Sequence, residues 1–141
     1  MDVLLPFFSG LVSALSPENL LYALIGCVIG TLVGVLPGIG PVAGIAILLP
    51  TTYALDPTGA LVMLAAIYYG TMYGGTITSV LMNVPGETAS VITAVEGHAM
   101  ARKGRAGSAL TIAAIASFVA GTLATLAIVF LAQPLTALGL M

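Results

Sequence analysis

Three tracts of this chain contain no charged residue, and they are too long to be simple membrane-crossing helices. They cover residues 19–55, 57–86 and 106–141. The first would extend about 55 Å as a single helix at ~1.5 Å per residue, whereas the apolar core of a bilayer is about 30 Å thick. The first two tracts must therefore turn or break.

The composition excludes most other classes of protein. Charged residues make up 6% of the 141 residues and hydrophobic residues 60%, whereas an ordinary soluble domain is about 25% charged. A soluble enzyme or a disordered tail needs more polar surface, and a nucleic-acid binder needs a basic face. The apolar runs also exceed the ~9–11 residues of a barrel strand. We therefore expect an all-α integral membrane protein, a polytopic helical bundle.

Proline–glycine pairs indicate where the apolar tracts break. Pro37-Gly38 and Pro85-Gly86 interrupt the first two tracts, because proline lacks an amide donor and glycine relaxes the backbone. We therefore expect Pro-Gly-broken or re-entrant helices. The expected elements are an apolar helix over 2–15, a helix over 16–36, a break at 37–41, an apolar segment over 42–54, a helix over 58–82, a break at 83–87, a short segment over 88–95, a basic loop at 97–106 and a span over 107–131.

Local signals support several of these boundaries. Ser16, Pro17 and Glu18 are an N-cap, a first-turn proline and a first-turn acid, and Asp56-Pro57 precedes the next helix. Gln133-Pro134 is expected to end the last span. All Lys and Arg residues lie in 102–105, which predicts that residues 98–105 are cytoplasmic. The N-terminus lacks the basic region of a signal peptide.

Gly26, Gly30 and Gly34 recur every four residues and share one helix face. Such a stripe of small residues allows another backbone to approach closely. The partner is either another helix of the same bundle or a second copy of the chain. The second reading gives an alternative function, a small structural or assembly membrane protein that oligomerises through the stripe.

Residues 67–79 are the most polar part of any expected span, with three tyrosines, three threonines and a serine. They indicate either the lining of a polar cavity or an aromatic belt at the membrane interface. The two breaks also allow two readings. Helix N-termini near 41 and 87 would direct positive dipole ends at an anion, or the breaks are ordinary surface loops.

No enzyme or metal site is expected. Residues 38–43 match G-x-G-x-x-A but lack the preceding strand and the later acid of a dinucleotide site. Glu96 and His98 fit no metal motif, and no Ser/His or paired-acid arrangement lies in the spans. A solvated cluster of charges explains them, and no catalytic residue, metal ligand or cofactor is predicted.

Four segments together resemble the large membrane subunit of the tripartite tricarboxylate transporter family, the TctA type. They are residues 34–41 (GVLPGIGP), 67–75 (IYYGTMYGG), 83–86 (NVPG) and 96–104 (EGHAMARKG). The similarity extends over nearly the whole chain, with the segments in the same order.

The resemblance implies a secondary transporter for carboxylates such as citrate, driven by a cation gradient (sodium or proton) and located in the bacterial inner membrane. A periplasmic solute-binding protein (TctC type) would deliver the solute, and a small membrane subunit (TctB type) would accompany this one. Family members have two related halves, so residues 1–141 would be an N-terminal portion, an incomplete half of a two-repeat transporter.

Placed on this sequence, the family signatures predict substrate-binding residues in the two breaks and in the tyrosine-rich segment between them. They are Gly38, Gly40, Tyr69, Tyr73, Gly74, Gly75, Thr76, Ser79, Asn83, Gly86 and Ser90.

Overall fold

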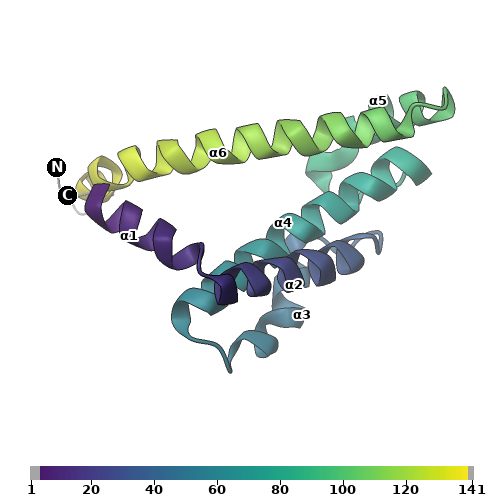
Figure 1. Cartoon of the computed structure of the whole chain (residues 1–141). Helices are drawn as coiled ribbons and strands as arrows, with labels where there is room; N and C mark the ends of the chain where they lie inside the picture. Colours follow the sequence, from purple (N-terminus) through teal and green to yellow (C-terminus); the bar gives the residue numbers. More distant parts are fainter. Residues whose placement is uncertain (1–3, 140–141) are drawn as a thin grey trace.

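The computed structural model describes the backbone of residues 4–139 and the side chains of residues 5–131. Every regular element in these residues is helical (Figure 1). The elements are α1 (Leu4–Ala14), α2 (Pro17–Gly34), α3 (Pro41–Leu48), the 3-10 helix η1 (Leu49–Thr52), α4 (Pro57–Met82), the 3-10 helix η2 (Thr88–Ser90), α5 (Val91–Arg102) and α6 (Ala106–Gly139). Three segments, 17–34, 57–82 and 106–131, are long and apolar enough to cross a membrane. The prediction of an all-α membrane protein with breaks near 37–41 and 83–87 is confirmed.

The starts of α2 and α4 are set by the expected caps. The Ser16 hydroxyl accepts a hydrogen bond from the Asn19 amide at 3.4 Å. The Asp56 carboxylate accepts from the amides of Thr58 and Gly59 at 3.0 and 3.2 Å. A helix leaves its first amides without partners inside the helix, so each cap satisfies groups that would otherwise be unpaired.

Removing the cap of α4 should measurably destabilise the protein. Asp56→Ala is expected to cost about 1 kcal/mol, because two amides lose their acceptor. Thermal unfolding of the detergent-purified protein measures this cost. Asp56→Asn keeps an acceptor oxygen and should stay close to wild type; an equal loss in both variants would contradict the capping role.

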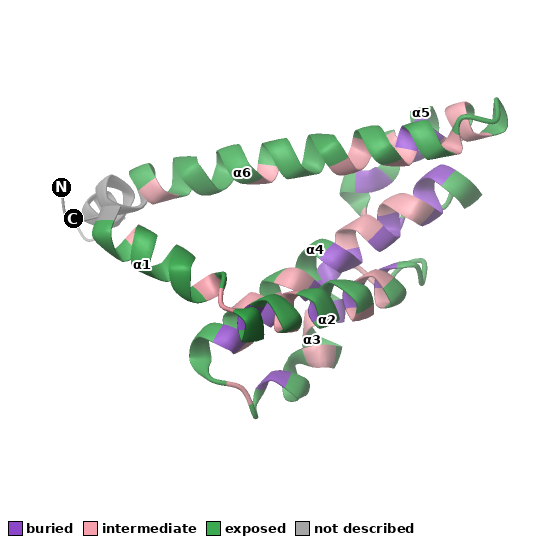
Figure 2. Cartoon of the chain, in the orientation of Figure 1, coloured by how far each residue is buried: buried purple, intermediate pink, exposed green. Residues whose placement is uncertain are grey.

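The core is the contact between α2 and α4, which run parallel. A Cβ added to Gly26, Gly30 or Gly34 would meet the backbone of Met63, Ile67 or Thr71 respectively, so the numbers rise together along both helices. Glycines of α4 pack on the backbone of α2 in the same way, since Gly70 lies against Cys27 and Gly74 lies against Thr31. Buried residues concentrate on this pair of helices (Figure 2). The glycine stripe is therefore used inside the chain, and oligomerisation through it has no free surface.

The first break turns the chain back along α4. Helix α2 ends at Gly34, beside Thr71, and residues 35–40 are not helical. Gly38 has φ of 86°, a left-handed conformation that glycine adopts without strain. Gly44 of α3 then lies against the Thr71 side chain. α2 and α3 thus form a hairpin that starts near the beginning of α4, reaches the middle of α4 and returns.

The second break forms a hairpin from the opposite direction. α4 ends at Asn83, whose φ of 56° is left-handed, and the chain then folds back until Gly86 contacts Gly75. α5 returns toward the end of α4, because Gly97 packs on Val80 and His98 Nδ1 lies 3.0 Å from the Val80 carbonyl oxygen. These contacts hold α5 beside the last turns of α4.

Two sequence-based boundaries are wrong. The basic loop expected at 97–106 is helix α5 as far as Arg102, and only 103–105 form a turn. Residues 91–102 contain no proline to interrupt a helix, and Gly97 allows a close contact with Val80. The final span does not end near 131, because α6 continues through Pro134 to Gly139. One proline removes a single backbone hydrogen bond, because it has no amide proton, and a long apolar helix can accommodate that loss.

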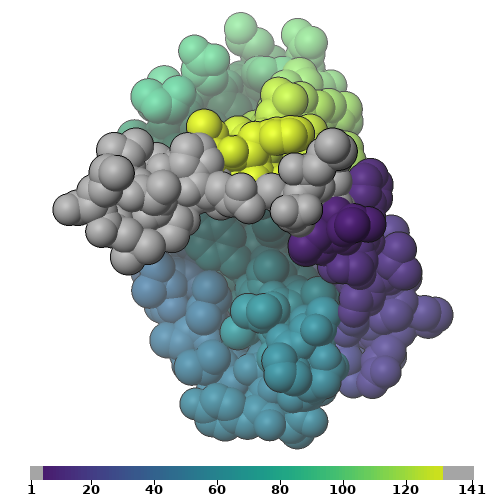
Figure 3. Space-filling view, turned by 90° about the vertical axis from the view of Figure 1, so that its left-hand side faces the viewer, coloured from purple at the N-terminus to yellow at the C-terminus, as the bar shows by residue number. Residues whose placement is uncertain are grey.

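Helix α6 diverges from α4 along its length (Figure 1), and its green and yellow atoms lie above the teal atoms in Figure 3. Among the described residues, one hydrogen bond joins α6 to α4, a long one of 3.5 Å from the Tyr73 hydroxyl to the Leu110 carbonyl oxygen. Ala109 is the only buried residue among the described side chains of α6. Most of α6 therefore presents apolar side chains outward.

Candidate functional site

The end of α2, where the first break begins, and the second break contact adjacent residues of α4. A Cβ added to Gly74 would lie 2.8 Å from the Cα of Gly34, the last residue of α2. A Cβ added to Gly75 would lie 3.4 Å from the Cα of Gly86 in the second break. Gly74 precedes the end of α4 by about 12 Å at ~1.5 Å per residue. The end of α2 and the tip of the second hairpin therefore both contact α4 well inside that helix.

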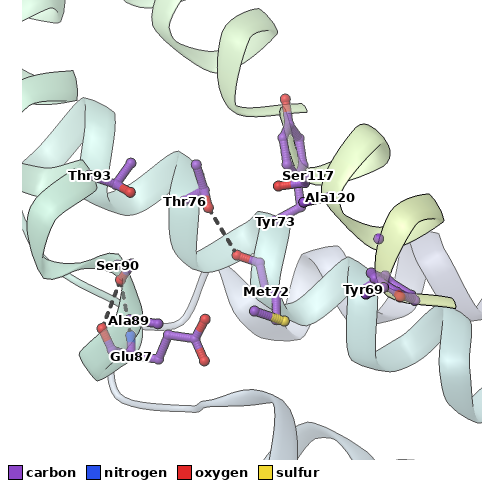
Figure 4. Close-up of a pocket in the computed structure, with 12 residues that line it drawn as sticks. Tyr69, Met72, Tyr73, Thr76, Glu87, Ala89, Ser90, Thr93, Ser117 and Ala120 are labelled. Carbon is purple, nitrogen blue, oxygen red and sulfur yellow. Dashed lines mark hydrogen bonds between the residues drawn. The ribbon is translucent and has the colours of Figure 1, made fainter. Parts of the chain in front are cut away.

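A cavity of about 440 Å³ lies beside these contacts, between α4, the η2–α5 segment and α6 (Figure 4). Its lining residues are Tyr69, Met72, Tyr73, Thr76, Glu87, Ala89, Ser90, Thr93, Ser117, Ala120, Gly121 and Ala124. A second cavity of about 460 Å³ adjoins it and shares Tyr69, Tyr73, Ser117 and Gly121. The wall is mostly apolar, with a few hydroxyl groups and one carboxylate, as in many small-molecule sites.

Four of the predicted residues line this cavity. Tyr69, Tyr73 and Thr76 come from one face of α4, and Ser90 comes from η2 after the second break. The tyrosine-rich segment thus contributes to a cavity through two of its three tyrosines. Tyr68 is not among the lining residues.

The other predicted residues lie outside the lining. Gly74, Gly75 and Gly86 pack backbone against backbone, and Ser79 is fully buried with its hydroxyl donating to the Gly75 carbonyl at 2.7 Å. Asn83 is the left-handed residue that ends α4. Gly38 and Gly40 belong to the first break, where a Cβ would meet no atom within 4 Å. In the structure, these residues contribute to packing and to backbone geometry, and they do not line the cavity.

Two hydroxyl groups in the cavity direct their protons at the backbone. Thr76 donates to the Met72 carbonyl at 3.2 Å, and Ser90 donates to the Glu87 carbonyl at 2.8 Å. The Ser90 oxygen also accepts from the Glu87 amide at 3.3 Å. A hydroxyl has only one proton to donate, so these two groups present oxygen lone pairs to a ligand.

Sequence reasoning missed Glu87, Thr93 and Ser117 as lining residues. Glu87 directly follows the Pro-Gly pair and is partly buried. Ser117, Gly121 and Ala124 are spaced so that they share one face of α6. That spacing of small residues was the available signal for a helix face that borders a cavity.

The structure around residue 87 differs from the predicted one, in which a helix N-terminus near 87 would direct its positive dipole end at an anion. The helix there is η2, only three residues long, and α5 begins at Val91. Glu87 itself occupies the N-cap position of η2, so the chain places its own negative charge where an anion was expected. The residues described by the structure contain no group of three His, Cys, Asp or Glu suited to hold a metal ion.

The fold and the site define a class of protein. The chain has three helices of membrane-crossing length, two hairpins that pack on α4 and a cavity beside α4. These features are typical of transporters built from broken helices. The chain belongs to the tripartite tricarboxylate transporter TctA family, whose model matches residues 20–141. The family is a family of membrane transporters, and its name implies partner subunits.

A relative in Agrobacterium vitis is similar along almost the whole chain. It is an uncharacterized 52.8 kDa protein from the TAR-I ttuC′ 3′ region, 51% identical over 140 residues. The match covers 99% of this chain and 28% of the relative, so the chain spans little more than a quarter of that protein's length. No solved structure matches the chain significantly.

Proposed function

We propose that this chain is part of the membrane subunit of a secondary carboxylate transporter in the bacterial inner membrane. The solute is a tricarboxylate of the citrate type, delivered by a periplasmic binding protein of the TctC type. A small membrane subunit of the TctB type completes the assembly. A gradient of sodium ions or protons drives uptake.

The observation that carries this proposal is that the end of α2 and the second break contact Gly74 and Gly75, two adjacent residues well inside α4. Irregular backbone at membrane depth is tolerated only where protein or a water-filled cavity surrounds it. Here the second break enters the wall of a cavity through Glu87 and Ser90. The two hairpins approach α4 from opposite directions and contact it at about the same level. Such an arrangement suits a site that opens alternately to each side of the membrane.

The solute fits the part of the cavity wall near Tyr69 and Ser117. Neither hydroxyl makes a hydrogen bond within the described residues, so both can donate to a carboxylate. These residues also border the second cavity, which extends the space toward α2 and α6. Because the chain is short relative to its homologue, further ligand groups would come from the remainder of the protein.

Arg102, Lys103 and Arg105 indicate the orientation. They lie at the end of α5 and in the turn that follows, beyond the end of α4. Basic residues concentrate in cytoplasmic loops, so the second hairpin enters from the cytoplasmic side and the α2–α3 hairpin from the periplasmic side.

Citrate uptake by cells that carry the complete transporter and its two partner subunits tests this function. Tyr69→Phe removes a hydroxyl donor and is expected to raise the KM for citrate about tenfold, the effect of losing ~1.4 kcal/mol of binding. Tyr53→Phe is the matched control, because Tyr53 is 76% exposed and lines neither cavity.

The energy source is tested in the same cells. Ionophores that collapse the sodium and proton gradients, with ATP maintained, should stop accumulation. Continued accumulation without either gradient, or no citrate uptake by the wild-type assembly, would contradict the proposed function.

A further inference from the structure

The cavity beside the breaks contains one ionisable carboxylate and no base. Glu87 lines it, and no Lys, Arg or His is among its lining residues. Figure 4 shows the Glu87 side chain extending along the cavity wall toward Met72. The Glu87 side chain accepts a hydrogen bond from the backbone amide of Ser90 in a capping box, but it has no positively charged partner in the cavity. A carboxylate at membrane depth without a basic partner marks a functional position.

The chain's own bases are too far away to neutralise Glu87. All three lie at 102–105, beyond the full length of α5, which extends about 18 Å at ~1.5 Å per residue. The titratable groups that face Glu87 from the surrounding elements are the phenols of Tyr69 and Tyr73 on α4. The lining residues from η2, α5 and α6 carry hydroxyl or apolar side chains.

Two of the hydroxyl groups that line the cavity with Glu87 supply oxygen acceptors. Thr76 and Ser90 donate their hydroxyl protons to backbone carbonyls, as described above. The Ser90 oxygen also accepts from the Glu87 amide, so each hydroxyl oxygen retains at least one lone pair for a ligand. One carboxylate and two such hydroxyl oxygens make a negative, acceptor-rich end of the cavity. A hard cation or a proton is the ligand that such a set of oxygens recognises, whereas a solute carboxylate would be repelled.

The position of Glu87 links this end of the cavity to the backbone of the second break. Gly86, the residue before it, packs on Gly75, and Thr76 follows Gly75 on α4. Cation binding between Glu87 and Thr76 would therefore hold the tip of the second hairpin against α4. Loss of the cation would leave an uncompensated negative charge at this contact.

We propose that the Glu87 carboxylate, with the hydroxyl oxygens of Thr76 and Ser90, binds the monovalent cation whose gradient drives transport. The solute then occupies the other end of the cavity, near Tyr69 and Ser117. This inference rests on the proposed function, because it assigns a role within the same cavity. It extends that function by separating a cation end from a solute end.

Proteoliposomes that contain the complete transporter and its partner subunits provide the test, with Glu87→Gln as the variant. Gradient-driven accumulation of citrate should fall at least tenfold, because the neutral amide cannot hold the cation. Citrate exchange across the membrane with equal cation concentrations on both sides should persist, since the solute end of the cavity is unchanged. Glu96→Gln, an exposed carboxylate on α5, is the matched control and should keep both activities.

Two titrations identify the cation. Sodium is varied at constant pH, and pH is varied without sodium, with the KM for citrate as the readout. The cation that lowers this KM in the wild type and no longer does so in Glu87→Gln is the one bound at Glu87. Glu87→Asp keeps the charge and should retain a cation dependence, displaced to higher cation concentration.

Two results would overturn the assignment while leaving the proposed function intact. One is a Glu87→Gln transporter with the cation dependence of the wild type. The other is a folded Glu87→Gln protein, monodisperse in detergent, that loses exchange as well as accumulation while Glu87→Asp loses exchange too. Failure of the wild-type assembly to transport citrate at all would instead contradict the proposed function.

Discussion

Gly30→Leu is expected to prevent stable pairing of α2 with α4. A Cβ at position 30 would lie 2.9 Å from the Ile67 Cα, and the neighbouring Ile67 carbonyl group is part of the same helix backbone. Backbone cannot rotate away as a side chain can, so the helices must separate. We expect a loss of more than about 3 kcal/mol, at or beyond the upper end of ordinary overpacking. Thermal unfolding of the complete protein in detergent measures the loss.

Gly107 provides a matched control for this prediction. It lies in α6, and an added Cβ would meet no atom within 4 Å. Gly107→Ala should be neutral or stabilising by up to ~1 kcal/mol, the difference in helix propensity. Gly30→Ala should already destabilise, so the same substitution has opposite effects at the two positions. Equal stability of Gly30→Leu and wild type would show that α2 and α4 do not pair as described.

Gly86→Val should abolish uptake while the protein still inserts into the membrane. A Cβ on Gly86 would lie 2.6 Å from the Gly75 Cα, so a branched side chain must push the second break off α4. Glu87 and Ser90, which follow in the chain, would leave the cavity wall. We expect citrate uptake to fall by about tenfold or more, because ligand groups displaced by as little as ~1 Å lose most of their effect.

Position 75 offers a graded comparison. A Cβ on Gly75 would be 3.4 Å from the Gly86 Cα, an ordinary close contact, so Gly75→Ala should retain much of the uptake and Gly75→Leu should retain little. Gly10→Val in α1 is the control for insertion, since a Cβ there would contact nothing within 4 Å. Normal uptake by Gly86→Val with normal expression would argue against a role for the contact between the second break and α4.

Much of the fold could be predicted because its strongest constraints are local. Pro37-Gly38 and Pro85-Gly86 lie in the two breaks, because a proline followed by a glycine disfavours a helix. Ser16 and Asp56 cap the helices that follow them. The regular spacing of the glycines in α2 predicted a close backbone contact, which the structure confirms. These signals depend on neighbouring residues, so they could be read from the sequence alone.

The partners of these features could not be predicted, because they lie far apart in the sequence. No local pattern shows that α2 pairs in parallel with α4, or that Gly86 returns to Gly75. Nothing in the sequence around Glu87 indicates that it lines the same cavity as Thr76. A short segment was predicted over 88–95, but the continuation of α5 to Arg102 was missed, because the contact of Gly97 with Val80 is not visible in the local sequence.

The parallel arrangement of α2 and α4 has a consequence for biosynthesis. Gly30 leaves the ribosome well before Ile67, the residue on which it packs. At a translation rate of ~5–20 residues per second, roughly 2 to 7 s pass between the synthesis of Gly30 and that of Ile67. During this interval the newly made hairpin of α2 and α3 lacks the helix that covers its glycines. The close packing of α2 on α4 can therefore form only after α4 has been made.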